Sequence, residues 1–195
     1  MNSIWVDALI QGVALGTPLA IAALGELVAE RAGVINLGVE GMMLVGAVVG
    51  FVVGVQTDSV ILAMAAAALA GMLLSLVHAV MTITFSVNQI VMGLVLTILG
   101  TGLSSYIGAD WGDKNLSPLV SDIEIPLLSK IPEVGEIFFD QDIFVYLTIL
   151  AAIWISYVLA RRPWGLWLRA TGESPAAADA AGVPVFSVRY AAVLF

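Results

Sequence analysis

The chain has 195 residues, of which 61% are hydrophobic and 11% are charged; its formal net charge is −8 and its mean hydropathy is +1.05. An average soluble domain is about 45–50% apolar and about 25% charged, so this composition excludes a soluble domain and predicts an all-α, polytopic membrane bundle. The absence of cysteine and the single histidine exclude thiol chemistry and zinc clusters, and the acidic balance disfavours a nucleic-acid partner.

Five apolar runs approach the roughly 20 residues that a membrane-spanning helix needs. They cover about 6–25, 39–55, 60–81, 88–108 and 143–160. A sixth run begins near Ser187 and stops at Phe195, too short to span. We therefore expect residues 1–195 to form a single transmembrane domain of five complete spans and the start of a sixth, with a C-terminal part missing.

Small residues recur every four positions in the first four runs, which predicts close packing of the helices. The clearest case is the stripe of Gly46, Gly50 and Gly54. A single stripe reflects the ordinary Gly and Ala content of membrane helices, but four in succession favour a tight bundle. In the first run, Pro18 is expected to bend the helix.

A polar segment, residues 26–38, precedes the glycine stripe and contains Glu26, Glu30, Arg31 and Asn36. It holds too much charge and glycine to lie bare in lipid. Irregular backbone at membrane depth is tolerated only at the surface, inside protein or along a watery cavity. We expect a connection between spans here, with a re-entrant segment as the alternative.

Basic residues set the orientation. Arg161, Arg162, Arg169 and Arg189 follow the fifth run and mark a cytoplasmic side, whereas the connection 110–142 is mostly acidic and should lie outside. Counting back places 26–38 and 82–88 inside, and 56–59 and the amino terminus outside. The proline-containing outer connection predicts short turns or a strand-like piece. It is either a solvated acidic face or a docking surface for an outside partner.

The inner connection, 161–186, contains a short predicted helix. Ser174 is suited to cap its start, Pro175 to its first turn, and Gly182 with Pro184 to its end. The alanine-rich surface between them suits a groove on another protein, although an ordinary linker helix has the same pattern.

The polar residues do not form a catalytic constellation. A lone histidine such as His78 is more often an interfacial hydrogen-bonding residue than a catalyst. Carboxylates at Glu26, Glu30 and Glu40 suit a proton or cation relay, or ordinary surface charges. Asn88 and Gln89 suit either a passage or bonds between helices. The chain contains no GxxxxGK[ST] phosphate loop, so it should not hydrolyse ATP itself.

Three segments resemble one known family. They are GELVAERAGVINLGVEGMMLVGA (25–47), VNQIVMGLVLTILGTGLSSYI (87–107) and GLWLRATGESPAAADAAGVPVFSVRY (165–190). Together they resemble the permease subunits of ATP-binding-cassette importers for nucleosides, simple sugars and branched-chain amino acids. They are most similar to the nucleoside permeases that basic-membrane-protein-like lipoproteins serve.

The resemblance implies a permease subunit of the bacterial inner membrane that carries a nucleoside or a simple sugar inward, and is not itself an enzyme. Its implied partners are a cytoplasmic ATPase, a second permease, an extracytoplasmic lipoprotein receptor and the lipid bilayer; no metal or cofactor is implied. The expected coupling-helix residues are Glu173, Ser174, Pro175, Ala177, Asp179 and Gly182. The loop departs from the Glu-Ala-Ala form of other importers.

Hydrogen-bonding groups in an apolar passage provide specificity, so Asn36, Asn88 and Gln89 are the candidate residues of the substrate path. Two alternatives remain. A secondary transporter driven by an ion gradient would use Glu26 or Glu40 as its coupling carboxylate and need no docking helix. A membrane scaffold, or a fragment that does not transport, would not associate with an ATPase.

Overall fold

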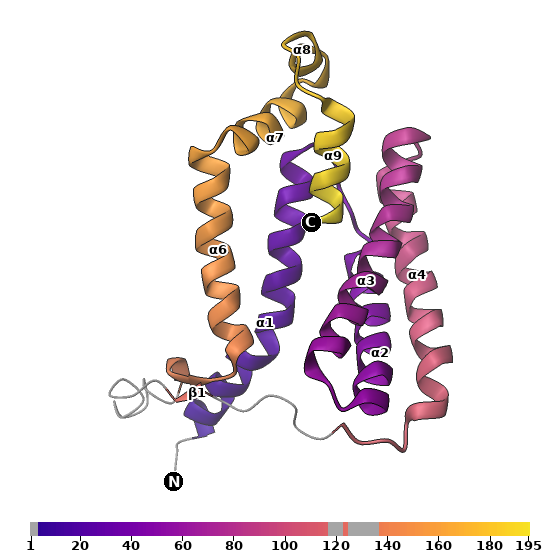
Figure 1. Cartoon of the computed structure of the whole chain (residues 1–195), viewed down its shortest axis with the longest axis vertical. Coiled ribbons are helices and arrows are strands. Elements are labelled where there is room, and N and C mark those ends of the chain that lie inside the picture. Colours follow the sequence, from indigo (N-terminus) through magenta and orange to yellow (C-terminus); the bar gives the residue numbers. More distant parts are fainter. Residues whose placement is uncertain (1–3, 117–122, 125–136) are drawn as a thin grey trace. The chain divides into compact units, whose positions relative to one another are not determined.

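The computed structural model of the chain describes residues 4–116, 123–124 and 137–195. Five helices are long and apolar enough to cross a membrane: Ile4–Arg31, Val39–Thr57, Val60–Thr84, Gln89–Trp111 and Ile143–Arg161. Each corresponds to one of the five predicted runs, and the only strands within the described ranges are two residues long. The predicted all-α, polytopic architecture is confirmed (Figure 1).

The elements follow one another along the chain with short connections. The helices are α1 (Ile4–Arg31), α2 (Val39–Thr57), α3 (Val60–Ala79), α4 (Gln89–Gly108), α6 (Ile143–Arg161), α7 (Pro163–Glu173), α8 (Pro175–Ala180) and α9 (Val185–Leu194). A π-helical turn, η1 (Val80–Thr84), extends α3, and a 3-10 turn, η2 (Ala109–Trp111), extends α4. The strands are β1 (Ile123–Glu124) and β2 (Asp140–Gln141).

The chain divides into two compact units. The first comprises Met1–Leu24 and Val120–Tyr157, and the second comprises Gly25–Leu119 and Val158–Phe195. The expected single domain therefore stays a prediction for the chain as a whole. The second unit holds the polar segment and the short inner helix.

In the first unit, β1 and β2 pair antiparallel, with Ile123 opposite Gln141 and Glu124 opposite Asp140. This pair is the strand-like piece expected in the outer connection, most of which lies outside the described residues. Asp142 begins α6, because its carboxylate accepts hydrogen bonds from the amides of Phe144 and Val145 at 2.8 and 3.1 Å.

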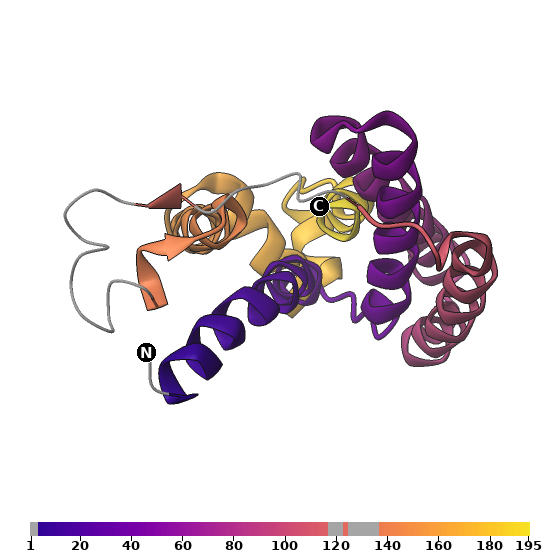
Figure 2. The ribbon, with the colours of Figure 1, turned by 90° about the horizontal axis from the view of Figure 1, so that it is seen from below.

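Pro18 lies inside α1, which changes direction along its length (Figure 2). Proline lacks the amide hydrogen that would bond the carbonyl four residues earlier, so it is the cause of the bend. The preceding Thr17 donates its hydroxyl to the Val13 carbonyl at 2.8 Å. The expected kink is thus accommodated within a continuous helix.

The length of α1 corrects one expectation. We expected the first helix to end near residue 25, but Glu26 and Glu30 form part of α1, and only residues 32–38 form the connection to α2. The residues between, Leu27 to Arg31, include several strong helix formers and no glycine. Helix propensity therefore carries α1 onward as far as Gly33.

In the second unit, α2 lies between α3 and α4, and the three helices run side by side (Figures 1 and 2). Gly46 and Gly50 face α3: a Cβ built on Gly46 would lie 3.2 Å from the Ala67 carbonyl oxygen, and one on Gly50 would lie 3.2 Å from that of Ala63. Gly54 is buried in the same helix. Small residues thus let the backbones of α2 and α3 approach closely.

The contact between α2 and α4 is tighter still. A Cβ built on Gly41 would meet the Leu96 carbonyl oxygen and lie 2.7 Å from the Thr97 Cα, and one built on Gly100 would lie 2.5 Å from the Gly41 Cα. Real Cβ atoms do not approach backbone this closely. These two glycines are therefore required by the packing of α2 on α4.

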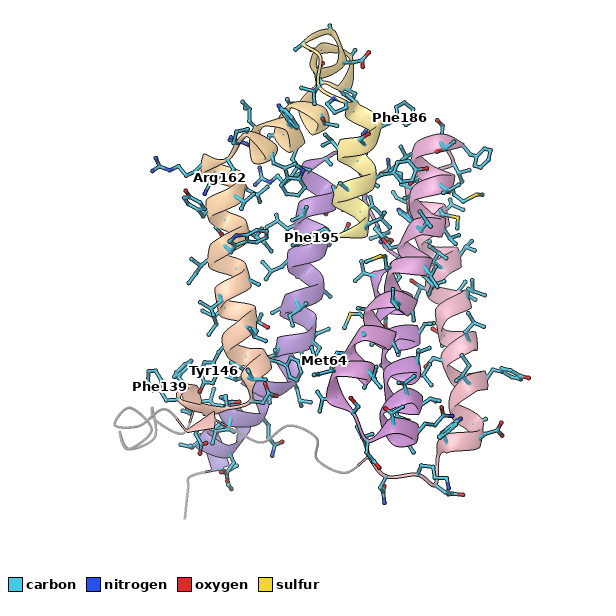
Figure 3. All side chains as sticks on the ribbon, viewed as in Figure 1. Met64, Phe139, Tyr146, Arg162, Phe186 and Phe195 are labelled. Carbon is cyan, nitrogen blue, oxygen red and sulfur yellow. The ribbon has the colours of Figure 1, made fainter. Side chains whose placement is uncertain are left out.

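Apolar side chains project outward around the helices (Figure 3). Met64 of α3 and Phe186 of α9 are 46% and 64% exposed, and Ile98 of α4 is 74% exposed. In water such a surface would be costly, whereas lipid chains solvate it without penalty. The exposure follows from membrane insertion.

We expect Gly100→Ala to lower the free energy of unfolding by about 1–3 kcal/mol, because the added methyl group must push α2 and α4 apart. Thermal unfolding in detergent measures the change. Gly102→Ala is the matched control, since no described atom outside its helix lies within 4 Å of a Cβ there. Equal stability of both variants would contradict the close packing of α2 on α4.

Candidate functional site

The connection between α1 and α2, residues 32–38, begins with a turn that only glycine adopts readily. Gly33 has φ +79°, and its amide donates to the Glu30 carbonyl at 2.9 Å while that of Val34 donates to Ala29 at 3.1 Å. This is the Schellman pattern that commonly ends helices. Gly33 therefore ends α1 and directs the chain toward α3 and α4.

Side chains of α3 and α4 bind the backbone of this connection. Gln89 Oε1 accepts from the Ile35 amide at 2.7 Å, the imidazole Nε2 of His78 donates to the Ile35 carbonyl at 3.2 Å, and Thr97 donates to the Leu37 carbonyl at 3.0 Å. Irregular backbone at membrane depth must find such partners inside the protein. The connection is accordingly fixed by side chains distant in sequence.

Glu26 and Asn36 shape the entry into α2. The carboxylate of Glu26 accepts from the Asn36 amide at 2.7 Å, and the Asn36 side-chain oxygen accepts from the Gly38 amide at 2.9 Å. The Asn36 amide nitrogen lies 3.4 Å from the Met42 sulfur. Asn36 is 6% exposed, so its side chain acts within the protein in this conformation.

The three candidate path residues are thus found close to one another in sequence space and structure, but with different partners. Gln89 also donates to the Gly33 carbonyl at 3.4 Å, which ties α4 to the connection. Asn88 instead caps α4, accepting from the amides of Ile90 and Val91 at 3.0 and 3.1 Å. These bonds give each side chain a structural role; a role in a substrate path stays a prediction.

Gly93 places α4 directly beneath the connection. A Cβ built on Gly93 would lie 2.8 Å from the Leu37 nitrogen and 2.9 Å from that of Gly38. We expected Gly93 only as a member of a packing stripe, together with Thr97. The structure shows that this stripe contacts a loop as well as a helix, a distinction that helical spacing does not contain.

The expected short inner helix is α8. Ser174 accepts from the Ala177 amide at 3.4 Å, and the helix ends where Gly182 adopts φ +84°. The amides of Gly182 and Val183 donate to Asp179 and Ala178 at 2.8 and 3.0 Å, a second Schellman pattern. The sequence signals at both ends therefore act as expected.

One face of α8 is free of contacts with the rest of the described chain. Ala178 is buried against the molecule, whereas Ser174, Ala177, Asp179 and Gly182 are exposed. Glu173, which we expected in this helix, is the last residue of α7. The amphipathic helix α7 was not predicted; Pro163, after two arginines, was the available signal for its start.

Within the described ranges, no three of His, Asp and Glu come together as a metal site would require. The polar groups instead converge at one end of the second unit. There, the connections 32–38 and 82–88 and the segment 161–186 meet, and these are the three that the basic residues assign to the cytoplasmic side. Together these features define a polytopic helical membrane protein with an exposed helical segment on the expected cytoplasmic side.

The chain belongs to the family described as branched-chain amino acid transport system / permease component, whose model matches residues 8–195. Over 93% of this chain it is 43% identical to the "Putative glucose ABC transporter permease protein TsgC13" of Haloferax volcanii. It is 36% identical, over 91%, to the nucleoside ABC transporter permease protein NupC of Lactococcus lactis. It is 35% identical, again over 91%, to the guanosine ABC transporter permease protein NupQ of Bacillus subtilis.

The chain spans 56–59% of the length of these relatives. No solved structure matches it. The expected resemblance to the nucleoside, sugar and branched-chain amino-acid branch is confirmed, and the family is one of transport components rather than enzymes. With the five apolar helices, the family assigns a multi-pass protein of the cytoplasmic (inner) membrane.

We expect Gln89→Leu to speed amide hydrogen exchange at Ile35 about tenfold, because the substitution leaves a buried amide without its acceptor. Exchange measured on a peptide covering 32–38 reports the change. Asn88→Ala is the control: it should loosen the start of α4, at Ile90 and Val91, and leave 32–38 unchanged. Equal exchange in 32–38 for Gln89→Leu and the parent would contradict the assigned bond.

Proposed function

We propose that this chain acts as a permease subunit of an ATP-binding-cassette importer and moves a small polar solute, a nucleoside or a simple sugar, into the cytoplasm. The observation that carries the proposal is the family match over residues 8–195. Relatives named for glucose and for nucleosides both match across most of the chain. Hydroxyl-rich solutes of these two classes are therefore the candidates.

The expected partners follow from the same proposal. A cytoplasmic ATPase would contact α8, whose exposed face carries small side chains and the carboxylate of Asp179. A second permease would complete the path, and an extracytoplasmic lipoprotein would deliver the solute to the outer side. The family match favours ATP-driven transport over transport driven by an ion gradient. Consistent with this, the Glu26 carboxylate accepts a backbone hydrogen bond at 2.7 Å.

The substrate path is the second part of the proposal. Asn36, Asn88 and Gln89 cluster around the connection 32–38 and the start of α4, where amide groups lie in an otherwise apolar bundle. Amides both donate and accept hydrogen bonds, as recognition of a nucleobase or a sugar requires. Solute entry would require these amides to exchange their present partners for the solute.

To test α8 as the docking surface, Ala177→Trp would be compared with Gly112→Trp in the assembled importer. Both positions are exposed, and Gly112 lies at the other end of its helix region with open space around it. We expect the indole at 177 to abolish co-purification of the ATPase and solute uptake, because it prevents close contact with α8. Retention of the ATPase by Ala177→Trp would contradict this docking surface.

To test the path, Asn36, Asn88 and Gln89 would each be replaced by alanine, and uptake of radiolabelled guanosine and radiolabelled glucose would be measured. We expect the ratio of the two uptake rates to change by about tenfold at a residue that contacts the solute, since a lost hydrogen bond discriminates between them. The ratio does not depend on the amount of folded protein. An unchanged ratio for all three variants would reject the path assignment.

A further inference from the structure

The two segments that flank α8 both contact the carboxyl end of α1. On one side, Gly172 is the penultimate residue of α7, two positions before the residue that caps α8. A Cβ built on Gly172 would meet the Arg31 carbonyl oxygen and lie 3.3 Å from the Gly33 nitrogen. The end of α7 therefore rests directly on the end of α1.

On the other side, Arg189 of α9 reaches the same place. Its Nε donates to the Ala32 carbonyl at 3.2 Å, and its Nη2 would lie 3.4 Å from a Cβ built on Gly33. The last carbonyls of a helix have no partner within the helix, and a cation there also interacts favourably with the helix dipole. Arg189 thus completes the end of α1 from a residue 157 positions away.

The helix that carries Arg189 is itself firmly held. Ser75 of α3 donates to the Val193 carbonyl, and the hydroxyls of Thr84 and Tyr190 lie 2.5 Å apart. Val193 also belongs to a buried cluster with Ala29, Val34, Ala79 and Ile83. Arg189 is the charged contact in this otherwise apolar and hydroxyl-mediated attachment. A displacement of α9 is therefore applied to α1 at a defined point.

The connection that receives this contact leads onward to every helix of the unit. Residues 35–37 are bound by His78 of α3 and by Gln89 and Thr97 of α4, and α2 begins at Val39. A movement imposed at Ala32 and Gly33 is consequently passed to three spans through backbone hydrogen bonds. No other described connection contacts both arms of α8.

We propose that Arg189 is a positioning residue that couples movement of α8 to the connection 32–38, and that Gly172 is the second point of the same coupling. This proposal rests on the proposed function, in which α8 receives the ATPase. The planar guanidinium fits over Gly33 while donating to Ala32, which the compact ammonium group of lysine does not reproduce. Transmission thus requires the shape of arginine as well as its charge.

The first experiment uses the complete importer, reconstituted in lipid with its ATPase, second permease and receptor. Arg189→Gln and Arg189→Lys are compared with Arg169→Gln, whose arginine bonds only to Gly165 in its own helix, at 3.4 Å. Three quantities are measured: ATPase co-purification, solute-stimulated ATP hydrolysis, and uptake of radiolabelled guanosine and glucose.

We expect Arg189→Gln to retain the ATPase at the parental ratio but to lose uptake and solute-stimulated hydrolysis about tenfold, because a hydrogen bond from a charged donor is removed. Arg189→Lys should fall between the two, and Arg169→Gln should match the parent. Parental uptake in Arg189→Gln would overturn the proposal. Loss of the ATPase together with uptake would also overturn it, since Arg189 would then serve docking or folding.

A second measurement needs no transport. Because the chain has no cysteine, spin labels placed by Ile35→Cys and Ala177→Cys report only the distance between the connection and α8. In lipid nanodiscs we expect one narrow distance distribution for the parent and for Arg169→Gln, and a broad one for Arg189→Gln. An equally narrow distribution in Arg189→Gln would overturn the coupling, whereas failure of the parent to bind any ATPase would reject the proposed function alone.

Discussion

The structure depends on satisfying the backbone of seven residues, 32–38, that lie between two membrane helices without forming a helix themselves. In lipid an unpaired amide or carbonyl costs several kcal/mol. The chain meets this cost with side chains from three directions: Glu26 from α1, His78 from α3, and Gln89 with Thr97 from α4. The positions of α3 and α4 relative to the connection follow from these bonds.

Glycine has two separate uses in this arrangement. At Gly33 and Gly182 it supplies the positive φ angle that ends α1 and α8. At Gly41, Gly93, Gly100 and Gly172 it supplies space, because a side chain there would overlap with the backbone of another element. The first use makes sharp turns at the inner side of the bundle, and the second lets helices and loops meet without side chains between them.

The sequence predicted the elements well because their signals are local. Apolar length defined the five spans, and the Ser174, Pro175 and Gly182 pattern defined α8 to within one residue. The extension of α1 past residue 25 was missed because charge suggested a loop where helix propensity continued the helix. Helix α7 was missed because its eleven residues, with glycine and several polar side chains, do not resemble a span.

The partners of the polar residues lay beyond sequence reasoning for a different reason. The bond between Gln89 and Ile35 joins positions 54 apart, and that between Arg189 and Ala32 joins positions 157 apart. No periodicity within one helix encodes such pairs. Asn36, Asn88 and Gln89 could be chosen as polar groups in an apolar bundle, but their individual partners required coordinates, and Arg189 had carried only the orientation of the chain.

The backbone seam between α2 and α4 has a mechanical consequence. Where Gly41 meets Gly100, no side chain lies between the two helices, so there are no rotamers to rearrange when force is applied across the seam. A contact of this kind is stiff, because backbone atoms already at van der Waals distance resist further approach. During a transport cycle α2 and α4 should therefore travel as one rigid body, and opening must take place along surfaces where flexible side chains form the contact.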